Sequence, residues 1–281
     1  MLKAELKHIK DFYWSKRTGR GSIFDLGPFA SVVPYGDKYV GACRNGSAGL
    51  GDMVAVINFD SNLDIISQHE ITKGEDPRVF LYNQEPHAIT WDPSPNPQGP
   101  GNVFYYKVIN LISGVVKTLQ IENVPLTRVE TLGKNWMPLV KDNELYIVLT
   151  IEPHLCVLHC NLSQSKCSWV TPYELVKDGL SITYSRGGTP FIYHEEHGCY
   201  FGLGHRTYNC HYHTPFLYTV SNDFGHAYIG PDLLTSRIDG VSDPLSIFKR
   251  GEKYYCCIAH CPEQLGDTRE ATSALYEVIV S

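Results

Sequence analysis

The sequence lacks any run of about 18 apolar residues, and this absence excludes a membrane-spanning helix. Its first residues, MLKAELKHIKDFYW, contain no apolar core and no small-residue cleavage site, so they do not predict a signal peptide. The chain of 281 residues also lacks a surplus of basic residues, and its formal net charge of −6 argues against a nucleic-acid-binding surface. These absences predict a globular protein with no membrane span and no nucleic-acid partner.

Disulfide pairing is not expected, although the sequence contains 9 cysteines. An odd number cannot pair completely, and most of the cysteines lie inside apolar runs, where cysteine behaves as a small hydrophobic residue. We therefore interpret the cysteines as reduced residues of strands, Cys160 and Cys167 included. Because reduced cysteines are typical of the cytosol, we expect a cytoplasmic protein.

Two signals of the common nucleotide-sugar enzymes are absent as well. The chain has no Asp-x-Asp motif, and its strand signals do not alternate with helical ones. These absences exclude the usual α/β folds of such enzymes, so a transferase with this sequence would need another architecture.

A loose repeat is the most informative feature that the sequence does contain. Each of five copies has a proline, a short apolar run, a polar turn and a second, aromatic-rich run, and the copies recur at intervals of roughly 50 to 60 residues. Hairpins of strands with such a period are typical of a β-propeller. The copies are Pro28–Arg44, Pro77–Trp91, Pro138–Thr150, Pro190–His205 and Pro244–His260.

We therefore predict an all-β fold in which residues 1–281 form a single domain, a five-bladed β-propeller with blades that start near residues 28, 77, 138, 190 and 244. Further strand signals give four strands to each of the first four units, whereas the fifth shows only three before Ser281. Because a ring must close, we expect the N-terminal segment to supply the missing outer strand of the last blade. The same segment, roughly Leu2–Ser15, contains the only helix-like pattern in the chain.

The repeat also predicts where a functional site lies. In a propeller the first strand of each blade lines the central channel, so residues beside the five prolines converge although they are far apart in the sequence. The second strands end near the same mouth of the channel. These positions hold acids, guanidinium groups and imidazoles, namely Glu75, Asp76, Arg78, Lys134, Asn135, Arg186 and Asp243 beside the prolines, and Arg44, Glu152, His154, His205, Arg206 and His260 at the ends of the second strands.

Such a set suits a polar, anionic or hydroxyl-rich ligand, because carboxylates accept hydrogen bonds from hydroxyl groups and arginines bind phosphates through two hydrogen bonds. For any single residue the alternative is a structural role, since Asp-Pro is a common way to open a turn.

A histidine and a tryptophan near these motifs could either bind a ligand or have a structural role. His213 joins His205 as a ligand-binding histidine, and no metal site is predicted because the spacing of His205, Cys210, His211 and His213 matches no closed zinc site. Trp136 could stack on a sugar ring or a nucleobase, and packing in the core is its alternative role.

The segment Gly74-Glu75-Asp76-Pro77-Arg78 resembles a motif of the five-bladed propeller carbohydrate-active enzymes, above all the mannoside phosphorylases and the related protozoan mannosyltransferases. The chain is more broadly similar to the five-bladed glycoside hydrolases that act on arabinan, xylan and fructan. This resemblance spans about residues 25–260. It implies that Asp76 is a proton donor, as in the phosphorylases, and that a phosphate group would be held by Arg44, Arg78, Lys134, Arg186 and His205.

From these residues and this resemblance we predict an inverting glycosyltransferase, which moves a sugar from a nucleotide-sugar donor to a glycan or sugar acceptor. Asp76 would activate the acceptor hydroxyl as a general base, and the basic residues would hold the diphosphate. The sugars would be positioned by Glu152, His154, His205 and Asp243. No cofactor is predicted apart from a divalent metal, Mn or Mg, that would accompany the nucleotide sugar.

Two alternatives stay open at this stage. A glycoside phosphorylase would use the same Asp76 as the acid. A hydrolase would use Asp76 and Asp243, with Glu152 as a third candidate, because hydrolysis takes two carboxyl groups across the scissile bond. A non-catalytic propeller would bind a glycan or a protein at the same mouth of the channel.

Overall fold

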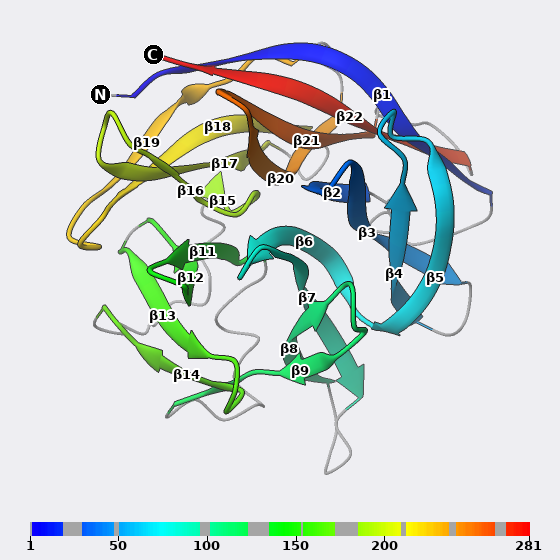
Figure 1. The fold of residues 1–281 in the computed structure, drawn as a ribbon, viewed down its shortest axis with the longest axis horizontal. Coiled ribbons are helices and arrows are strands. Elements are labelled where there is room, and N and C mark those ends of the chain that lie inside the picture. Colours follow the sequence, from blue (N-terminus) through cyan, green and yellow to red (C-terminus); the bar gives the residue numbers. More distant parts are fainter. Residues whose placement is uncertain are drawn as a thin grey trace.

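The computed structural model describes residues 2–18, 30–47, 51–95, 102–122, 135–152, 154–171, 185–208, 212–235, 240–261 and 268–281, and their regular structure consists entirely of β-strands. Viewed down its shortest axis, the molecule is a ring of sheets around a common centre (Figure 1). Five sets of strands follow one another around this ring, and a single parallel bridge between His213 and Val241 joins the last two sets into one hydrogen-bonded sheet. The predicted all-β, five-bladed β-propeller is confirmed. Within the described ranges, no helix is long and apolar enough to cross a membrane.

The first two blades are regular antiparallel sheets of four strands. In each of them the strands are hydrogen-bonded in the order in which they occur along the chain, and the first strand lies nearest the centre (Figure 1). Blade 1 consists of β2 (Ala30–Tyr35), β3 (Lys38–Ser47), β4 (Gly51–Phe59) and β5 (Ile65–Lys73), and blade 2 of β6 (Glu75–Tyr82), β7 (Glu85–Pro95), β8 (Asn102–Asn110) and β9 (Val116–Thr118).

Blades 3 and 4 depart slightly from this plan. In blade 3 the short strand β10 (Gln120–Ile121), which precedes the blade, adds parallel to its outermost strand. In blade 4 the inner position is divided between two short strands that both pair with the same long one. Blade 3 consists of β11 (Met137–Lys141), β12 (Glu144–Thr150), β13 (Cys156–Asn161) and β14 (Lys166–Trp169), and blade 4 of β15 (Ser185–Arg186), β16 (Ile192–His194), β17 (Cys199–Tyr208), β18 (Tyr212–Ser221) and β19 (Ala227–Asp232).

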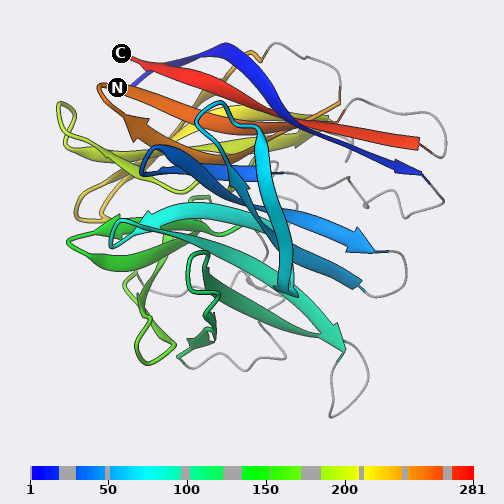
Figure 2. The ribbon, with the colours of Figure 1, turned by 45° about the vertical axis from the view of Figure 1, so that its right-hand side comes forward.

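Blade 5 closes the ring with both ends of the chain. Its inner strands are β20 (Val241–Arg250), β21 (Lys253–Cys261) and β22 (Thr268–Val280), and β1 (Ala4–Thr18) pairs antiparallel with β22 along its whole length. Figures 1 and 2 both show β1 following β22, with the two termini side by side. The predicted closure of the last blade by the N-terminal segment is therefore confirmed.

The helix-like pattern of residues 2–15 does not form a helix, and that expectation is wrong. The free edge of β22 offers a row of unpaired backbone donors and acceptors, and pairing with it satisfies the backbone of β1. Helix propensity is a weak preference of a few tenths of a kcal/mol per residue, so tertiary pairing of this length overrides it.

Apolar side chains pack between neighbouring blades. One buried cluster joins blades 2 and 3 through residues such as Phe80 and Leu158, and another joins blades 3 and 4 through residues such as Leu139 and Phe216. Because the core occupies the spaces between the sheets, the inner strands can present polar groups to the centre of the ring.

Serine hydroxyl groups join the innermost strands of three blades. Ser31 of β2 accepts a hydrogen bond from the Val79 backbone N–H at 3.0 Å and donates one to the Leu245 carbonyl at 3.3 Å. In the same region the hydroxyl of Ser246 accepts from the Val32 N–H and donates to the Val32 carbonyl. Both serines are fully buried, so these bonds satisfy backbone groups that water does not reach.

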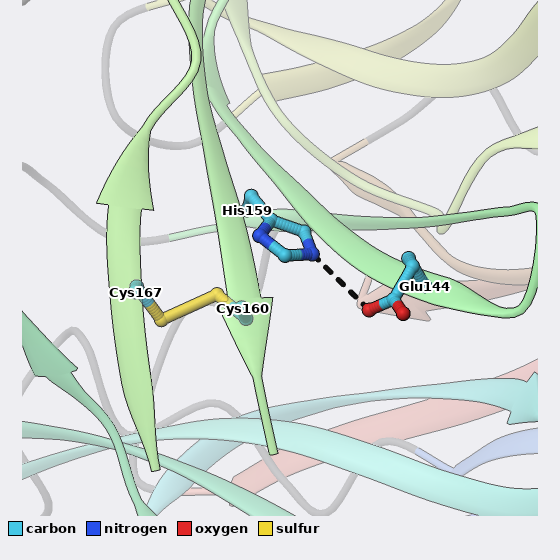
Figure 3. Close-up of a disulfide and its surroundings, with 4 residues drawn as sticks. All are labelled: Glu144, His159, Cys160 and Cys167. Carbon is cyan, nitrogen blue, oxygen red and sulfur yellow. Dashed lines mark hydrogen bonds and ion pairs between the residues drawn. A yellow bond between two sulfur atoms is a disulfide. The ribbon is translucent and has the colours of Figure 1, made fainter. Parts of the chain in front are cut away.

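One disulfide lies near the rim of blade 3 (Figure 3). Cys160 of β13 and Cys167 of β14 are directly opposite each other in the antiparallel pair, and their sulfur atoms are bonded. On the other side of β13, His159 Nε2 lies 3.1 Å from a carboxylate oxygen of Glu144. The prediction that the cysteines are reduced is therefore wrong for this pair, because the register of β13 with β14 brings the two residues together. The cytoplasmic location stays a prediction.

We predict that Ser31→Ala lowers the free energy of unfolding by about 2 kcal/mol, because the Val79 N–H and the Leu245 carbonyl lose their partner in a site closed to water. Chemical denaturation of both proteins measures this difference. The exposed Ser67→Ala serves as the control and is expected to change stability by less than about 0.5 kcal/mol. Equal stability of Ser31→Ala and the unmodified protein would show that the hydroxyl does not join the blades.

Candidate functional site

An irregularity at the start of β6 determines the direction of the Asp76 side chain. Glu75 pairs with Trp91 and Arg78 pairs with Ile89, so β6 has one more residue than β7 over this stretch and forms a β-bulge. Asp76 lies inside this bulge with a φ of 48°, a left-handed conformation that Asp tolerates better than most residues. Bulges of this kind turn a side chain out of the regular alternation of a strand.

The carboxylates of Glu75 and Asp76 both face Arg44, which comes from β3 of the neighbouring blade. The Arg44 Nη1 atom lies 3.3 Å from Asp76 and 3.5 Å from Glu75. A small pocket of about 10 Å³ opens beside these carboxylates, and its volume corresponds to about one water molecule. Thr90, Trp91 and other residues of blades 2 and 3 line this pocket.

Arg78 lies at the point where three blades meet. Its Nη2 donates to the Asn135 side-chain oxygen at 2.9 Å, and its Nη1 donates to the Pro244 carbonyl at 3.0 Å. Only 3% of the residue is exposed, and this burial lowers the pKa of the guanidinium, whereas the carboxylates of Asp76 and Asp243 act to raise it. The two acids therefore both act on one buried cation.

Asn135 is held in place by its own backbone conformation and by a close neighbour. Its φ is 68°, which Asn adopts more readily than other residues apart from Gly. Gly187 of blade 4 approaches so closely that a Cβ atom there would lie 2.0 Å from the Asn135 carbonyl oxygen. The absence of a side chain at Gly187 thus lets blade 4 pack directly against the residue that binds Arg78.

Asp243 forms the opposite side of the site together with two histidines. Its carboxylate lies 2.5 Å from His213 Nδ1 and 3.8 Å from His205 Nδ1. The two imidazole rings are stacked, with centroids 4.8 Å apart. Among the described residues, His205 Nδ1 is a buried polar atom without a hydrogen-bond partner.

The environment holds Asp243 as an anion. Burial acts to raise the pKa of this carboxyl group, but His213, His205 and Arg78 outweigh burial and hold the pKa well below its ordinary value. Burial has the opposite consequence for His205, whose pKa it lowers to about 3 against the opposing effect of Asp243. The centre of the site therefore contains a permanent carboxylate beside a neutral imidazole at neutral pH.

These residues could also hold a cation. The ligand atoms of His205, His213 and Asp243 all lie within 4.8 Å of one another. In the structure the three groups contact one another: His213 lies against the Asp243 carboxylate, and its ring stacks on that of His205.

The structure brings together eight of the predicted site residues and leaves a ninth at their edge. The eight are Arg44, Glu75, Asp76, Arg78, Asn135, His205, His213 and Asp243. Arg186 pairs with His205 across β15 and β17 and contributes positive charge to its surroundings.

Other predicted residues lie outside this cluster. Glu152 and His154 are exposed in the connection between β12 and β13. Arg206 follows His205 and points to the other face of β17, because side chains alternate along a strand. It forms an ion pair with Asp232, and its guanidinium lies 4.8 Å from the Phe216 ring centroid. The prediction that these three residues line one site with Asp76 is not supported by their positions.

His260 and Trp136 have structural surroundings. His260 is 1% exposed and lies between the Ser242 hydroxyl at 2.9 Å and the Tyr276 hydroxyl at 2.8 Å. Trp136 is equally buried and stacks on Tyr106, with ring centroids 3.2 Å apart. The alternative of core packing fits Trp136 better than stacking on a ligand, and substrate binding by His260 is likewise not supported. Lys134 lies outside the described residues.

Sequence reasoning missed two features of the site. Trp91 and Thr90 line the pocket beside Asp76, although neither was predicted as a site residue. The pairing of β6 with β7 places Trp91 opposite Glu75, so a signal was present in the hairpin register of the second repeat. The ion pair between His213 and Asp243 crosses from blade 4 to blade 5 and left no signal in the local sequence.

We predict that His205→Gln makes the protein less sensitive to acid. The unfolded chain protonates His205 near its ordinary pKa of about 6.5, whereas the folded chain does not do so until about pH 3, so stability falls as pH decreases between these values. Between about pH 7 and about pH 4 the unmodified protein should lose about 3 kcal/mol more than the variant, as measured by urea denaturation.

The exposed His69→Gln is the matched control, and it should retain the acid sensitivity of the unmodified protein. Parallel stability curves for His205→Gln and the unmodified protein over this pH range would contradict a neutral, buried His205.

Comparison with known proteins places the fold among carbohydrate-active enzymes. No protein-family model matches the sequence, and no curated protein sequence matches it. The catalytic domain of the GH62 α-L-arabinofuranosidase of Coprinopsis cinerea is similar in structure, with a TM-score of 0.60, 10% identity and coverage of 94% of this chain and 97% of that chain. An exo-β-1,3-galactanase of Phanerochaete chrysosporium gives a TM-score of 0.57, 11% identity and coverage of 92% and 64%.

A GH43 α-L-arabinofuranosidase of Clostridium thermocellum is similar too, with a TM-score of 0.52, 9% identity and coverage of 85% and 83%. These neighbours are glycoside hydrolases, and this finding overturns the predicted nucleotide-sugar glycosyltransferase. The comparison gives no support to the resemblance to mannoside phosphorylases either. At these identities the similarity establishes the fold: the chain has the five-bladed β-propeller fold found in GH43 and GH62 enzymes.

Proposed function

We propose that this protein is a glycoside hydrolase that acts on a short glycoside at the centre of the propeller. The observation that carries the proposal is the placement of carboxylates from two blades around one buried arginine, with Asp76 in blade 2 and Asp243 in blade 5 both acting on Arg78. Hydrolysis of a glycosidic bond uses two carboxyl groups with different roles. The similar fold of the arabinofuranosidases and the galactanase supports the same reaction class.

The two carboxyl groups have surroundings that suit different roles. Asp243 is held as an anion by His213 and Arg78, so it suits the group that activates water or stabilises positive charge on the sugar. Asp76 shares the single guanidinium of Arg44 with Glu75. In this mechanism Asp76, which lines the small pocket beside β6, gives the proton that the leaving-group oxygen requires.

Arg78, Asn135 and His213 have supporting roles in this mechanism. Arg78 keeps the inner ends of blades 2, 3 and 5 together through Asn135 and Pro244, and this fixes the separation of the two acids. His213 orients the carboxylate of Asp243. Positioning of this kind is effective because small displacements of a catalytic group greatly reduce the rate.

A panel of aryl glycosides and short oligosaccharides tests this proposal. We expect release of sugar from at least one arabinoside, xyloside or galactoside without any requirement for phosphate or a nucleotide. Asp76→Asn and Asp243→Asn should each lower kcat by at least about 100-fold, since general acid–base groups contribute on that scale.

Asp142→Asn in the exposed turn between β11 and β12 is the control, because Asn tolerates the left-handed conformation found there (φ 53°). It should retain full activity. Absence of turnover with the whole panel, or activity that survives both Asp76→Asn and Asp243→Asn, would overturn the proposal in favour of a binding propeller or a different site.

A further inference from the structure

A second group of metal-ligating side chains lies away from the central site, in the turn between β16 and β17 of blade 4. His194 ends β16, Glu196 and His197 lie in the turn, and Gly198 returns the chain to β17 with a φ of 60°. One ligand atom from each of His194, Glu196 and His197 lies within 4.8 Å of the others. We propose that these three residues bind a divalent transition metal, zinc by preference.

The spacing of the two imidazoles supports this assignment. The Nδ1 atoms of His194 and His197 are 3.2 Å apart and share a hydrogen bond, which a bound ion would replace. Two nitrogen ligands at 2.0–2.1 Å from a tetrahedral zinc ion are separated by about 3.3 Å, so both rings can ligate one ion with little rearrangement. Two imidazoles and one carboxylate form a ligand set that suits zinc better than calcium or magnesium, which prefer oxygen ligands.

One of the ligands is already fixed in position. His194 is 7% exposed, and its ring packs against Phe201 and Tyr254, with centroids 5.9 Å and 5.7 Å away. Glu196 and His197 are exposed in the turn and can adjust around an ion held by His194. A site with one rigid and two adaptable ligands needs less ordering on binding than one formed wholly by exposed residues.

The surroundings of this turn favour the binding of a metal ion that keeps one coordination position open. A pocket of about 340 Å³ between blades 4 and 5 is lined by both His194 and Glu196. Four glutamates and two lysines lie along this pocket, and one of the lysines, Lys253, forms a 2.8 Å ion pair with Glu277. Because three protein ligands leave a fourth zinc position open, a bound ion would present this position to the pocket.

Zinc titration of the full chain tests the proposal. After removal of adventitious metal with a chelator, the protein competes with a chromophoric zinc indicator, and we expect it to take up one zinc ion at the turn. His197→Ala and Glu196→Gln should each weaken zinc binding at least about tenfold, the smallest effect typical of changes near a metal. Both residues are exposed, and an unchanged circular dichroism spectrum will show that the fold is retained.

Two matched variants separate this site from the other histidines. His226→Ala, in the exposed turn between β18 and β19, should leave zinc affinity unchanged. His213→Ala should leave it unchanged as well, because His213 belongs to the central cluster. Loss of binding in His213→Ala with full binding in His197→Ala would assign the metal to the centre and overturn the proposal, and so would the absence of zinc uptake by the unmodified protein.

Cobalt substitution gives a readout that is independent of affinity. Cobalt(II) bound by His194, Glu196 and His197 should give the absorption of a tetrahedral ion with nitrogen and oxygen ligands. Cys199 is paired with His194 across the β16–β17 hairpin but is not one of the clustered ligands. A thiolate charge-transfer band would therefore assign the ion to a cysteine site and contradict the proposed ligand set.

Discussion

The buried charge of Arg78 is the constraint on which the centre of this protein depends. A guanidinium group with 3% exposure needs hydrogen-bond acceptors and nearby negative charge, because a buried cation without them is costly. Asn135 and the Pro244 carbonyl accept from its two Nη atoms, whereas its Nε has no hydrogen-bond partner among the described residues; Asp76 and Asp243 supply the charge. These groups come from three blades, so a shift of one blade relative to the others would remove part of this compensation. Because the charge of Arg78 must be compensated, the inner strands are held in position and both Asp76 and Asp243 lie around this one cation.

This arrangement divides the site into two unlike sides. On one side Arg44 is shared between two adjacent carboxylates, and on the other Asp243 is surrounded by His213, His205 and the Arg78 charge. Carboxyl groups in unlike surroundings are what acid–base chemistry requires, since one must give a proton while another remains ionised. The propeller provides this difference because each blade contributes its own neighbours to the centre.

The fold could be predicted from the sequence largely because the same residue types recur in each blade: a proline, an apolar run and a turn. Closure could be predicted because a ring with one incomplete blade requires a strand from another part of the chain. The site could be predicted where it follows the inner strands, as with Asp76, Arg78 and Asp243. It could not be predicted where the direction of a side chain depends on register. Arg206 is adjacent to His205 yet faces away from it, and Cys160 meets Cys167 only through the pairing of β13 with β14. The helix-like pattern at the start of the chain gave a wrong prediction because β1 forms a strand by pairing with β22, which lies far away in the sequence.

The closure of blade 5 has a consequence for the synthesis of the chain. The ribosome makes β1 before the 13 residues of β22, so β1 has no partner while the four intervening blades emerge. During this interval the ring is an open arc whose two end blades lack their neighbours. Blade 5 can be completed only when β22 has left the ribosome, and its pairing then joins β22 to a strand made before the other four blades. The order of translation thus delays closure of the centre, and with it assembly of the site, until β22 has been made.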